Sequence, residues 1–356
     1  MTGAAQTPAG LVCPLSAVGA NDRAVAGGKG ASLGELHRAG LPVPPGFIVT
    51  VRAFGDAMRT ADPDGTAGTE LARLPAADPT AIERAAAAVR ARITAAPLRT
   101  DIAAEITAAY KSLGSDVPVA VRSSAIGEDA AEASFAGLQD TYLWIRGASA
   151  VLDHVRKCWA SLYNTEAVSY RLRQGMPEGD VAMAVVVQRM VDPRSAGVMF
   201  TCSPQTGDRS VIAIEGSWGL GSVLVSGEVT PDSFVVSKVT GEILRRTVAA
   251  KQRLHRANTL GTGTTAVDVD LALQEQPCLD DAEIRALAQL GRQVEQHYGV
   301  PQDIEWAITS DQIVLLQSRA ETVWSGRAAE PLATPKARPM DHVFEKLSQV
   351  TRVTEP

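Results

Sequence analysis

The sequence predicts an α+β fold, and three patterns within its 356 residues indicate that class. Apolar residues recur at helical spacing within Ala26–Gly40 and again within Asp280–Tyr298. The run Val181–Val191 carries no charge before Arg189, which is typical of a strand buried on both faces. Apolar and polar residues alternate across a turn in Pro301–Thr322, which predicts an antiparallel hairpin. A hydrophobic content of 45% allows a sizeable core, and the length predicts about two domains.

The composition excludes several classes of protein. A formal charge of −6 and a pI near 5.5 argue against a surface for nucleic acid or anionic membranes. No apolar run approaches the roughly 18 residues of a transmembrane helix. The start MTGAAQTPAG has neither the basic residues nor the apolar core of a signal peptide. The widely spaced cysteines fit neither a disulfide framework nor a zinc site, which predicts a reducing cytoplasm; they are Cys13, Cys158, Cys202 and Cys278.

A glycine loop followed by a helix is predicted for Ala26–Gly40, where Gly40 fits the position just after the helix. Lys29 lies in the loop at the predicted helix start. Free backbone N–H groups and the lysine could hold an anion together there, although a solvated lysine on a turn explains the pattern equally well. The spacing of glycines and lysine does not match a Walker loop.

The stretch Val119–Tyr142 begins in an apolar run, Val117–Val121, that predicts a buried strand. Arg122 follows with two serines, and a guanidinium beside hydroxyls suits a nucleotide polyphosphate because it can bind phosphate bidentately. Taken alone, a capped loop with a surface salt bridge is the simpler interpretation. The acidic pair Glu128 and Asp129 is expected to shape the small-residue loop that comes next.

The middle of the chain is predicted to consist of helices, strands and connections, with one segment suited to a ligand. Helices are expected at Thr80–Ala96 and Thr100–Ser112, and a long helical region at Ala148–Gln174. Strands are expected at Ser195–Thr201, Phe234–Val239 and Ile243–Val248, and Val211–Gly221 is expected to be a strand followed by a glycine-rich loop. The end of the buried strand, Gln188 to Val191, combines main-chain polar groups with apolar side chains. That combination suits an adenine ring, or plain core. Residues 60–80 and 256–278 are expected to be loose connections.

The register of the Pro301–Thr322 hairpin decides which polar side chains share a face, because a slip of one residue moves them to the other face. A two-residue turn at Ser310-Asp311 would pair Glu305 with Leu316. A three-residue loop would pair Glu305 with Gln317 and Asp303 with Arg319. We expect the three-residue loop, since it gathers the polar groups on one face.

A carboxylate and an amide oxygen on adjacent strands suit Mg²⁺, which keeps its other positions for water and phosphate oxygens. Glu305 and Gln317 would supply these oxygens, and Arg319 beside them would face a terminal phosphate. A buried salt bridge between Asp303 and Arg319 is the alternative. It gives no reason for Gln317 to share the face.

Seven collinear motifs together resemble the ATP-binding domain of the pyruvate phosphate dikinase and phosphoenolpyruvate synthase family, over roughly residues 11–322. They are GGKGASLGEL (27–36), VAVRSSAIGEDAAEASFAGLQDTY (119–142), VVVQRMV (185–191), GVMFT (197–201), EGSWGLG (215–221), DIEW (303–306) and LLQSR (315–319). The resemblance implies an ATP-grasp fold of two lobes with the nucleotide in the cleft between them. It places the lobes at residues 1–200 and 201–328, with a tail or partner-docking segment at 329–356.

The resemblance also implies the phosphate contacts. Lys29 and Arg122 would bind the phosphates as cations, and Arg319 would lie near the transferred phosphate. The loop Ala136–Thr141 would form a glycine-bearing lid over the phosphates. Its expected nucleotide contacts are Gly137, Asp140 and Thr141.

The other implied contacts concern adenosine and metal. The adenine would lie against Gln188, Met190 and Val191, and Glu215 would face the ribose. The implied Mg²⁺ ligands are Glu305 and Gln317, with Asp303 nearby. The expected cofactors are therefore ATP and Mg²⁺.

The family's phosphoryl-accepting histidine lies in a Thr-x-Gly-Gly-x-x-x-His pattern, which none of the five histidines here matches: His37, His154, His255, His297 and His342. We therefore expect a partner subunit that carries this histidine and binds the small-molecule acceptor. ATP would give AMP and phosphate, with the β-phosphate going to the partner's histidine. This two-component arrangement resembles phenylphosphate synthase or the cresol-phosphorylating synthase, which use phenolic or benzylic acceptors. A split phosphoenolpyruvate synthase, a rifampicin phosphotransferase and an ATP-sensing subunit without turnover are the alternatives.

Overall fold

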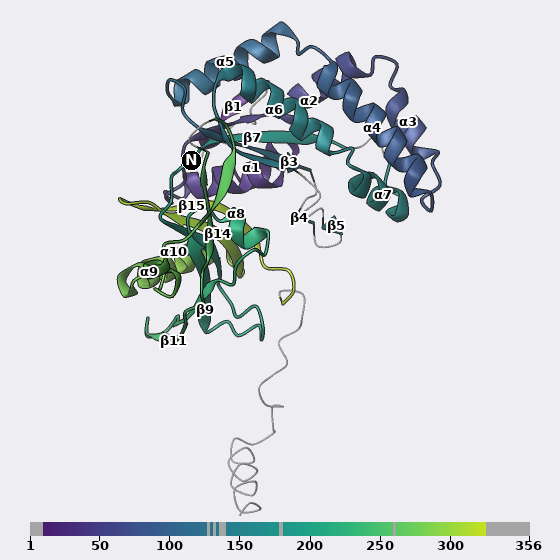
Figure 1. Cartoon of the computed structure of the whole chain (residues 1–356). Helices are drawn as coiled ribbons and strands as arrows, with labels where there is room; N and C mark the ends of the chain where they lie inside the picture. Colours follow the sequence, from purple (N-terminus) through teal and green to yellow (C-terminus); the bar gives the residue numbers. More distant parts are fainter. Residues whose placement is uncertain are drawn as a thin grey trace, which may run out of the picture. The chain divides into compact units, whose positions relative to one another are not determined.

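The structure is a computed structural model that describes residues 10–126, 129–130, 133–134, 140–177, 181–258 and 261–324 (Figure 1). Met1–Thr322 forms one compact unit, and Val323–Pro356 is a separate one. The expected tail at 329–356 lies outside the described residues. The first unit contains two main sheets and the helices that cover them, so the predicted α+β class is confirmed.

The first sheet has the strand order β1-β2-β7-β3-β6, and its paired neighbours are antiparallel. Its strands are β1 (Val12–Pro14), β2 (Gly46–Val49), β3 (Val119–Ala125), β6 (Thr141–Ile145) and β7 (Met183–Arg189). In the central strand β7, Val185 and Val187 pack into one apolar cluster, whereas Ala184 and Val186 pack into another. The strand is therefore buried on both faces, as its charge-free sequence predicts.

The two faces of the first sheet are covered by different helices. The helices of this region are α1 (Arg23–Arg38), α2 (Val51–Ala61), α3 (Thr66–Ala72), α4 (Pro79–Ala95), α5 (Thr100–Leu113), α6 (Ala148–Ser161) and α7 (Thr165–Gln174), with short 3₁₀ turns η1 (Leu15–Ala17) and η2 (Ala20–Asp22). Helix α1 packs on one face through Ala31 and Leu33, and the cluster on the other face includes residues of α2, α4, α5 and α6. One expectation is corrected here, because the connection at 60–80 contains α3. The helical region expected at Ala148–Gln174 is confirmed and consists of α6 and α7.

The second sheet has the strand order β11-β10-β9-β8-β14-β15. Its strands are β8 (Ser195–Phe200), β9 (Val211–Trp218), β10 (Asp232–Ser237), β11 (Ile243–Thr247), β14 (Gln302–Ile308) and β15 (Ile313–Ala320). Helix α10 (Asp281–Tyr298) packs against it, with Ile284, Leu287 and Val294 in one cluster with Trp306. Asp280 caps this helix, because its carboxylate accepts the Glu283 N–H.

Smaller elements complete the described chain. They are α8 (Ser222–Val225), α9 (Leu271–Gln274), the two-stranded sheet β12 (Arg253–Ala257) with β13 (Thr264–Asp268), and the pair β4 (Asp129–Ala130) with β5 (Ala133–Ser134). The segment at 256–278, expected to be loose, thus contains β13 and α9. Strand β8 belongs to the second sheet, so that sheet begins at Ser195, ahead of the lobe boundary expected after residue 200.

Helix α1 connects the two sheets. It packs on the first sheet, and its Ser32 hydroxyl donates a hydrogen bond of 2.5 Å to the Ser318 carbonyl of β15. All four cysteines are free and buried, and burial raises the pKa of the Cys13 thiol to about 11. Among the described residues, no helix is long and apolar enough to cross a membrane.

Candidate functional site

A cavity of about 430 Å³ lies between the two sheets, and we call it the central cavity. The first sheet and the segment after β7 line it with Ala120, Arg122, Thr141, Leu143, Gln188, Arg189, Met190, Val191 and Pro193. The second sheet and α8 line it with residues that include Val198, Glu305, Trp306, Leu316, Ser222 and Ser226. Its volume falls in the range of small-molecule and cofactor sites, and apolar walls with a few polar groups are typical of them.

Arg122 joins the two sheets across this cavity. Its Nη1 donates a hydrogen bond of 2.7 Å to the Leu316 carbonyl. Its Nη2 donates to Glu305 Oε2 at 3.0 Å and to Gln317 Oε1 at 2.7 Å. The residue is only 8% exposed, and its buried Nε has no hydrogen-bond partner among the described residues. A buried guanidinium N–H without a partner leaves a donor for an anionic ligand.

Arg122 lies inside a strand, which corrects the expectation that the strand ends before it. Strand β3 runs through Ala125, and all seven of its residues are buried. Arg122 pairs with Val186 on one side and with Thr141 on the other. A central position in the sheet fixes the direction of the side chain, because alternate residues of a strand point to opposite faces.

The C-terminal hairpin has the predicted pairing but not the predicted loop. Glu305 pairs with Gln317, and Asp303 pairs with Arg319, as expected. Nearer the turn, Trp306 pairs with Leu315, and the Thr309 N–H bonds to the Gln312 carbonyl around a two-residue turn. The three-residue loop was therefore wrong. A bulge between the two registers leaves Leu316 as the extra residue and shifts the later pairs by one.

The expected metal ligands Glu305 and Gln317 converge on one point. Their side-chain oxygens both lie within hydrogen-bonding distance of the same nitrogen, Nη2 of Arg122. Two hard oxygens that already share one cationic group form a donor set suited to Mg²⁺. The described residues include no group of three or more histidine, cysteine, aspartate or glutamate side chains that could hold a metal. The remaining ligands would then come from water and phosphate.

Asp303 is bound to Arg319 rather than to the metal pair. Arg319 contacts Asp303 Oδ2 through Nε at 2.9 Å and Nη2 at 2.8 Å. Burial raises the pKa of the Asp303 carboxyl, against the opposing effect of Arg319. The Asp303–Arg319 ion pair is present, although the Arg319 side chain is 45% exposed and the pair is therefore not fully buried. Glu305 and Gln317 share a face as expected, and the Mg²⁺ site itself stays a prediction.

Lys29 lies on the first turn after a break in α1, not in a loop. Gly27 breaks the helix with φ of 67°, and a Cβ at this glycine would lie 1.9 Å from the Ser124 carbonyl oxygen. Ser124 Oγ accepts the Gly30 N–H at 3.0 Å and donates to the Ala26 carbonyl at 2.8 Å. Ser124 thus positions the helical turn that carries half-buried Lys29.

The predicted adenine segment lines the central cavity through Gln188, Met190 and Val191. Gln188 is buried, and its Nε2 donates to the Pro44 carbonyl at 3.2 Å. The Met190 N–H donates to the Pro118 carbonyl at 2.9 Å, so this N–H is already engaged. The segment can offer apolar surface and the Gln188 side-chain oxygen to a ring.

Of the other predicted nucleotide contacts, some line the central cavity and some do not. Thr141 lines the cavity, whereas the Asp140 carboxylate accepts the Tyr142 hydroxyl at 2.7 Å. Glu215 pairs with Val198, which pairs with Glu305, so these three share one face of the second sheet. Glu215 is not among the residues that line the cavity. Gly137, Glu128 and the lid at 136–139 lie outside the described residues.

Helix α8 is the part of the site that sequence reasoning missed. Ser222 and Ser226 line the cavity directly after the EGSWGLG motif. The glycine-rich motif was a signal for a ligand-facing loop, but a four-residue helix has no periodicity to reveal it.

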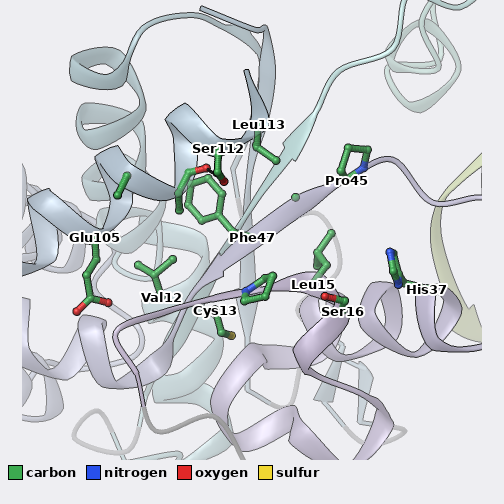
Figure 2. Close-up of a pocket in the computed structure, with 14 residues that line it drawn as sticks. Val12, Cys13, Leu15, Ser16, His37, Pro45, Phe47, Glu105, Ser112 and Leu113 are labelled. Atoms are coloured by element: carbon green, nitrogen blue, oxygen red, sulfur yellow. Dashed lines mark hydrogen bonds between the residues drawn. The ribbon is translucent and has the colours of Figure 1, made fainter. Parts of the chain in front are cut away.

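A second cavity of about 520 Å³ lies at the outer edge of the first sheet, and Figure 2 shows its lining. Val12, Cys13 and Phe47 line it from β1 and β2, with Glu105 from α5 and His37 from α1. None of the predicted site residues that the structure describes lines it. Some of the predicted site residues line the central cavity instead, namely Arg122, Thr141, Gln188, Met190, Val191 and Glu305. The others that the structure describes do not line it, namely Lys29, Asp140, Glu215, Asp303, Gln317 and Arg319.

Comparison with known proteins matches residues 23–339 to the family described as "Pyruvate phosphate dikinase, AMP/ATP-binding domain". A probable phosphoenolpyruvate synthase of Methanothermobacter thermautotrophicus is 46% identical over 88% of this chain and 46% of its own length. A rifampicin phosphotransferase of a Streptomyces species is 45% identical over 88% of this chain and 36% of its own. A phosphoenolpyruvate synthase of Pyrococcus furiosus is 40% identical over 85% of this chain and 42% of its own length. The chain spans less than half the length of these three relatives.

Proposed function

This chain belongs to the pyruvate phosphate dikinase AMP/ATP-binding domain family, with its ATP-grasp-type α+β fold, and from that premise we propose that it binds MgATP in the central cavity and drives histidine phosphorylation. The observation that carries the proposal is the convergence of Glu305 and Gln317 on Nη2 of Arg122, at a cavity that Arg122 and Glu305 line. The accepting histidine belongs to a separate domain or partner subunit, because no histidine here lies in the family's pattern.

The reaction we propose converts ATP and water to AMP and inorganic phosphate, with the β-phosphate transferred to a histidine nitrogen. Phosphoryl transfer depends mainly on positioning and on neutralising charge. Arg122 offers its unpartnered Nε to a phosphate oxygen. The family resemblance implies Lys29 and Arg319 as two further phosphate-binding cations. Mg²⁺, when bound, would neutralise phosphate charge between Glu305 and Gln317.

Two lines of argument favour different acceptors for the phosphate. The resemblance to the two-component synthases favours a phenolic or benzylic hydroxyl. The names of the relatives, phosphoenolpyruvate synthase and rifampicin phosphotransferase, favour pyruvate or rifampicin as the second candidate. The central cavity has no bearing on this choice if the acceptor binds on the histidine-bearing domain, as we propose.

The test begins with calorimetric titration of the protein with ATP and Mg²⁺. A polypeptide containing Thr-x-Gly-Gly-x-x-x-His, taken from a neighbouring reading frame, is then added with phenol, p-cresol, pyruvate or rifampicin. We expect ATP binding, AMP release and one phosphorylated acceptor. ADP without AMP contradicts the dikinase reaction. ATP binding without any turnover points to the sensing subunit, and absence of ATP binding contradicts the proposal as a whole.

A further inference from the structure

Helix α8 forms one wall of the central cavity, although it is too short to be stable alone. Leu220, Ser222, Leu224 and Ser226 of this segment line the cavity. A helix of four residues gains little from its own hydrogen bonds, so its position must come from neighbouring contacts. Those contacts decide the shape of the wall.

His255 of β12 supplies two of these contacts at the start of α8. The Leu220 N–H donates to the His255 carbonyl at 2.9 Å. The Ser222 hydroxyl lies 2.8 Å from His255 Nδ1. Gly219 lets the chains approach, because a Cβ there would lie 2.5 Å from the His255 carbonyl oxygen.

The same imidazole also reaches the residues that follow α8. His255 Nε2 lies 3.3 Å from Glu228 Oε2, and the Glu228 N–H donates to the Val223 carbonyl at 3.2 Å. The Ser226 hydroxyl donates to Glu228 Oε1 at 2.9 Å. A neutral imidazole satisfies both contacts: Nδ1 accepts the Ser222 hydroxyl, and Nε2–H donates to Glu228. His255 therefore connects the two ends of α8.

The hairpin that carries His255 also touches the opposite wall. Gly263, just before β13, donates its N–H to the Trp144 carbonyl of β6 at 3.2 Å. Trp144 follows Leu143, which lines the cavity from the first sheet. The β12–β13 hairpin is thus bonded to both sides of the cavity, while His255 itself is not among the lining residues.

We propose that His255 is a positioning residue for nucleotide binding, acting through Ser222 to hold α8 against the ligand. This inference rests on the proposed function, because it assumes ATP as the occupant of the central cavity. It predicts that ATP affinity falls when the contact with Ser222 is lost, and that it is retained in a variant that lacks the histidine but keeps this contact.

Two substitutions separate the contacts. His255→Asn places an amide near the Nδ1 position and can keep the Ser222 contact, whereas His255→Gln places it near Nε2 and loses that contact. We expect H255Q to weaken ATP binding about tenfold and H255N to stay within about threefold of the wild type. S222A should match H255Q, and the double variant S222A/H255Q should be no weaker than either one. His297→Gln is the control, since His297 pairs with Glu35 and does not line the cavity.

Thermal unfolding of each variant is measured beside ATP titration by calorimetry. A loss of ATP affinity in H255Q with rescue in H255N supports the proposal. Equal affinity in H255Q and wild type overturns it, and so does an equal loss in H255N and H255Q that scales with lost stability. A wild type that binds no ATP would instead contradict the proposed function, so the two failures are distinguishable.

Discussion

Arg122 of the first sheet donates a 2.7 Å hydrogen bond to the main-chain carbonyl of Leu316, the extra residue of the bulge in the second sheet. A bulge leaves its extra residue outside the regular ladder, which frees that carbonyl for another donor. The same bulge sets the pairing of Glu305 with Gln317. One irregularity in the hairpin thus supplies all three acceptors of the arginine.

Substitution of Arg122 should weaken ATP binding. Arg122→Gln removes the charge, and we expect about 10- to 100-fold weaker binding, because charge-assisted hydrogen bonds contribute about 1.5–3 kcal/mol. Arg122→Lys keeps the charge but loses the bidentate guanidinium geometry, so its ATP affinity should lie between those of the wild type and R122Q. Calorimetric titration with ATP measures both. The exposed Arg146→Ala is the control, and unchanged binding in R122Q would remove Arg122 from the site.

Arg122 and a metal ion should compete for the same oxygens. Because Arg122 Nη2 donates hydrogen bonds to the side-chain oxygens of both Glu305 and Gln317, the wild-type protein without nucleotide should bind Mn²⁺ weakly. R122Q frees the two oxygens, and we expect Mn²⁺ binding without ATP to tighten by about tenfold. Electron paramagnetic resonance of free Mn²⁺ follows the binding. Equal Mn²⁺ affinity in R122Q and wild type would argue against competition.

Glu305 and Asp303 should differ in their effect on the metal. Glu305→Gln should lower Mn²⁺ affinity in the presence of ATP by about tenfold or more. Asp303→Asn should lower it less, because Asp303 is engaged with Arg319. The same resonance titration compares the two variants with wild type. A larger loss in D303N than in E305Q would reverse the assignment of the ligand.

Gly27 should be far more sensitive to alanine than Gly40, although both have positive φ. Gly27→Ala would place a Cβ 1.9 Å from the Ser124 carbonyl oxygen, and we expect a loss of at least about 3 kcal/mol of unfolding free energy. Gly40→Ala meets nothing within 4 Å, so only backbone strain of about 1 kcal/mol is expected. Urea unfolding measures both losses. Equal losses would show that the helix break is not tightly packed.

Glu35 should make stability depend on pH. Burial alone would raise the pKa of its carboxyl, but the Ala20 N–H at 2.9 Å and His297 at 2.7 Å together lower it. A lowered folded-state pKa stabilises the fold above the unfolded glutamate pKa of about 4.3, and this stability is lost as the pH falls through the folded-state pKa.

Glu35→Gln should therefore reduce the free energy of unfolding by roughly 1 kcal/mol at pH 7. The difference from wild type should shrink once the pH falls below about 4.3. Urea unfolding at pH 7, 5 and 4 tests this, with the exposed Glu105→Gln as control. A difference that grows as the pH falls would contradict the assigned direction of the shift.

The strand and helix classes could be predicted because they depend on local periodicity. The buried run around Val185 and the capped helix after Asp280 both have the predicted structure. The pairing of Glu305 with Gln317 was also predictable, since alternation of polar and apolar residues restricts the register. The cause of this pairing could not be predicted, because a regular loop of odd length and a bulge give the same pairing at these residues.

By itself, the sequence determined which chemical groups this protein has and which of them lie on the same strand or turn. Only the tertiary structure decided that Arg122 binds Gln317, 195 positions away, and that His255 lies behind α8. The physical reason is the range of each signal. Periodicity and turn chemistry act over a few residues, whereas these contacts depend on how two sheets and a short helix pack around one cavity.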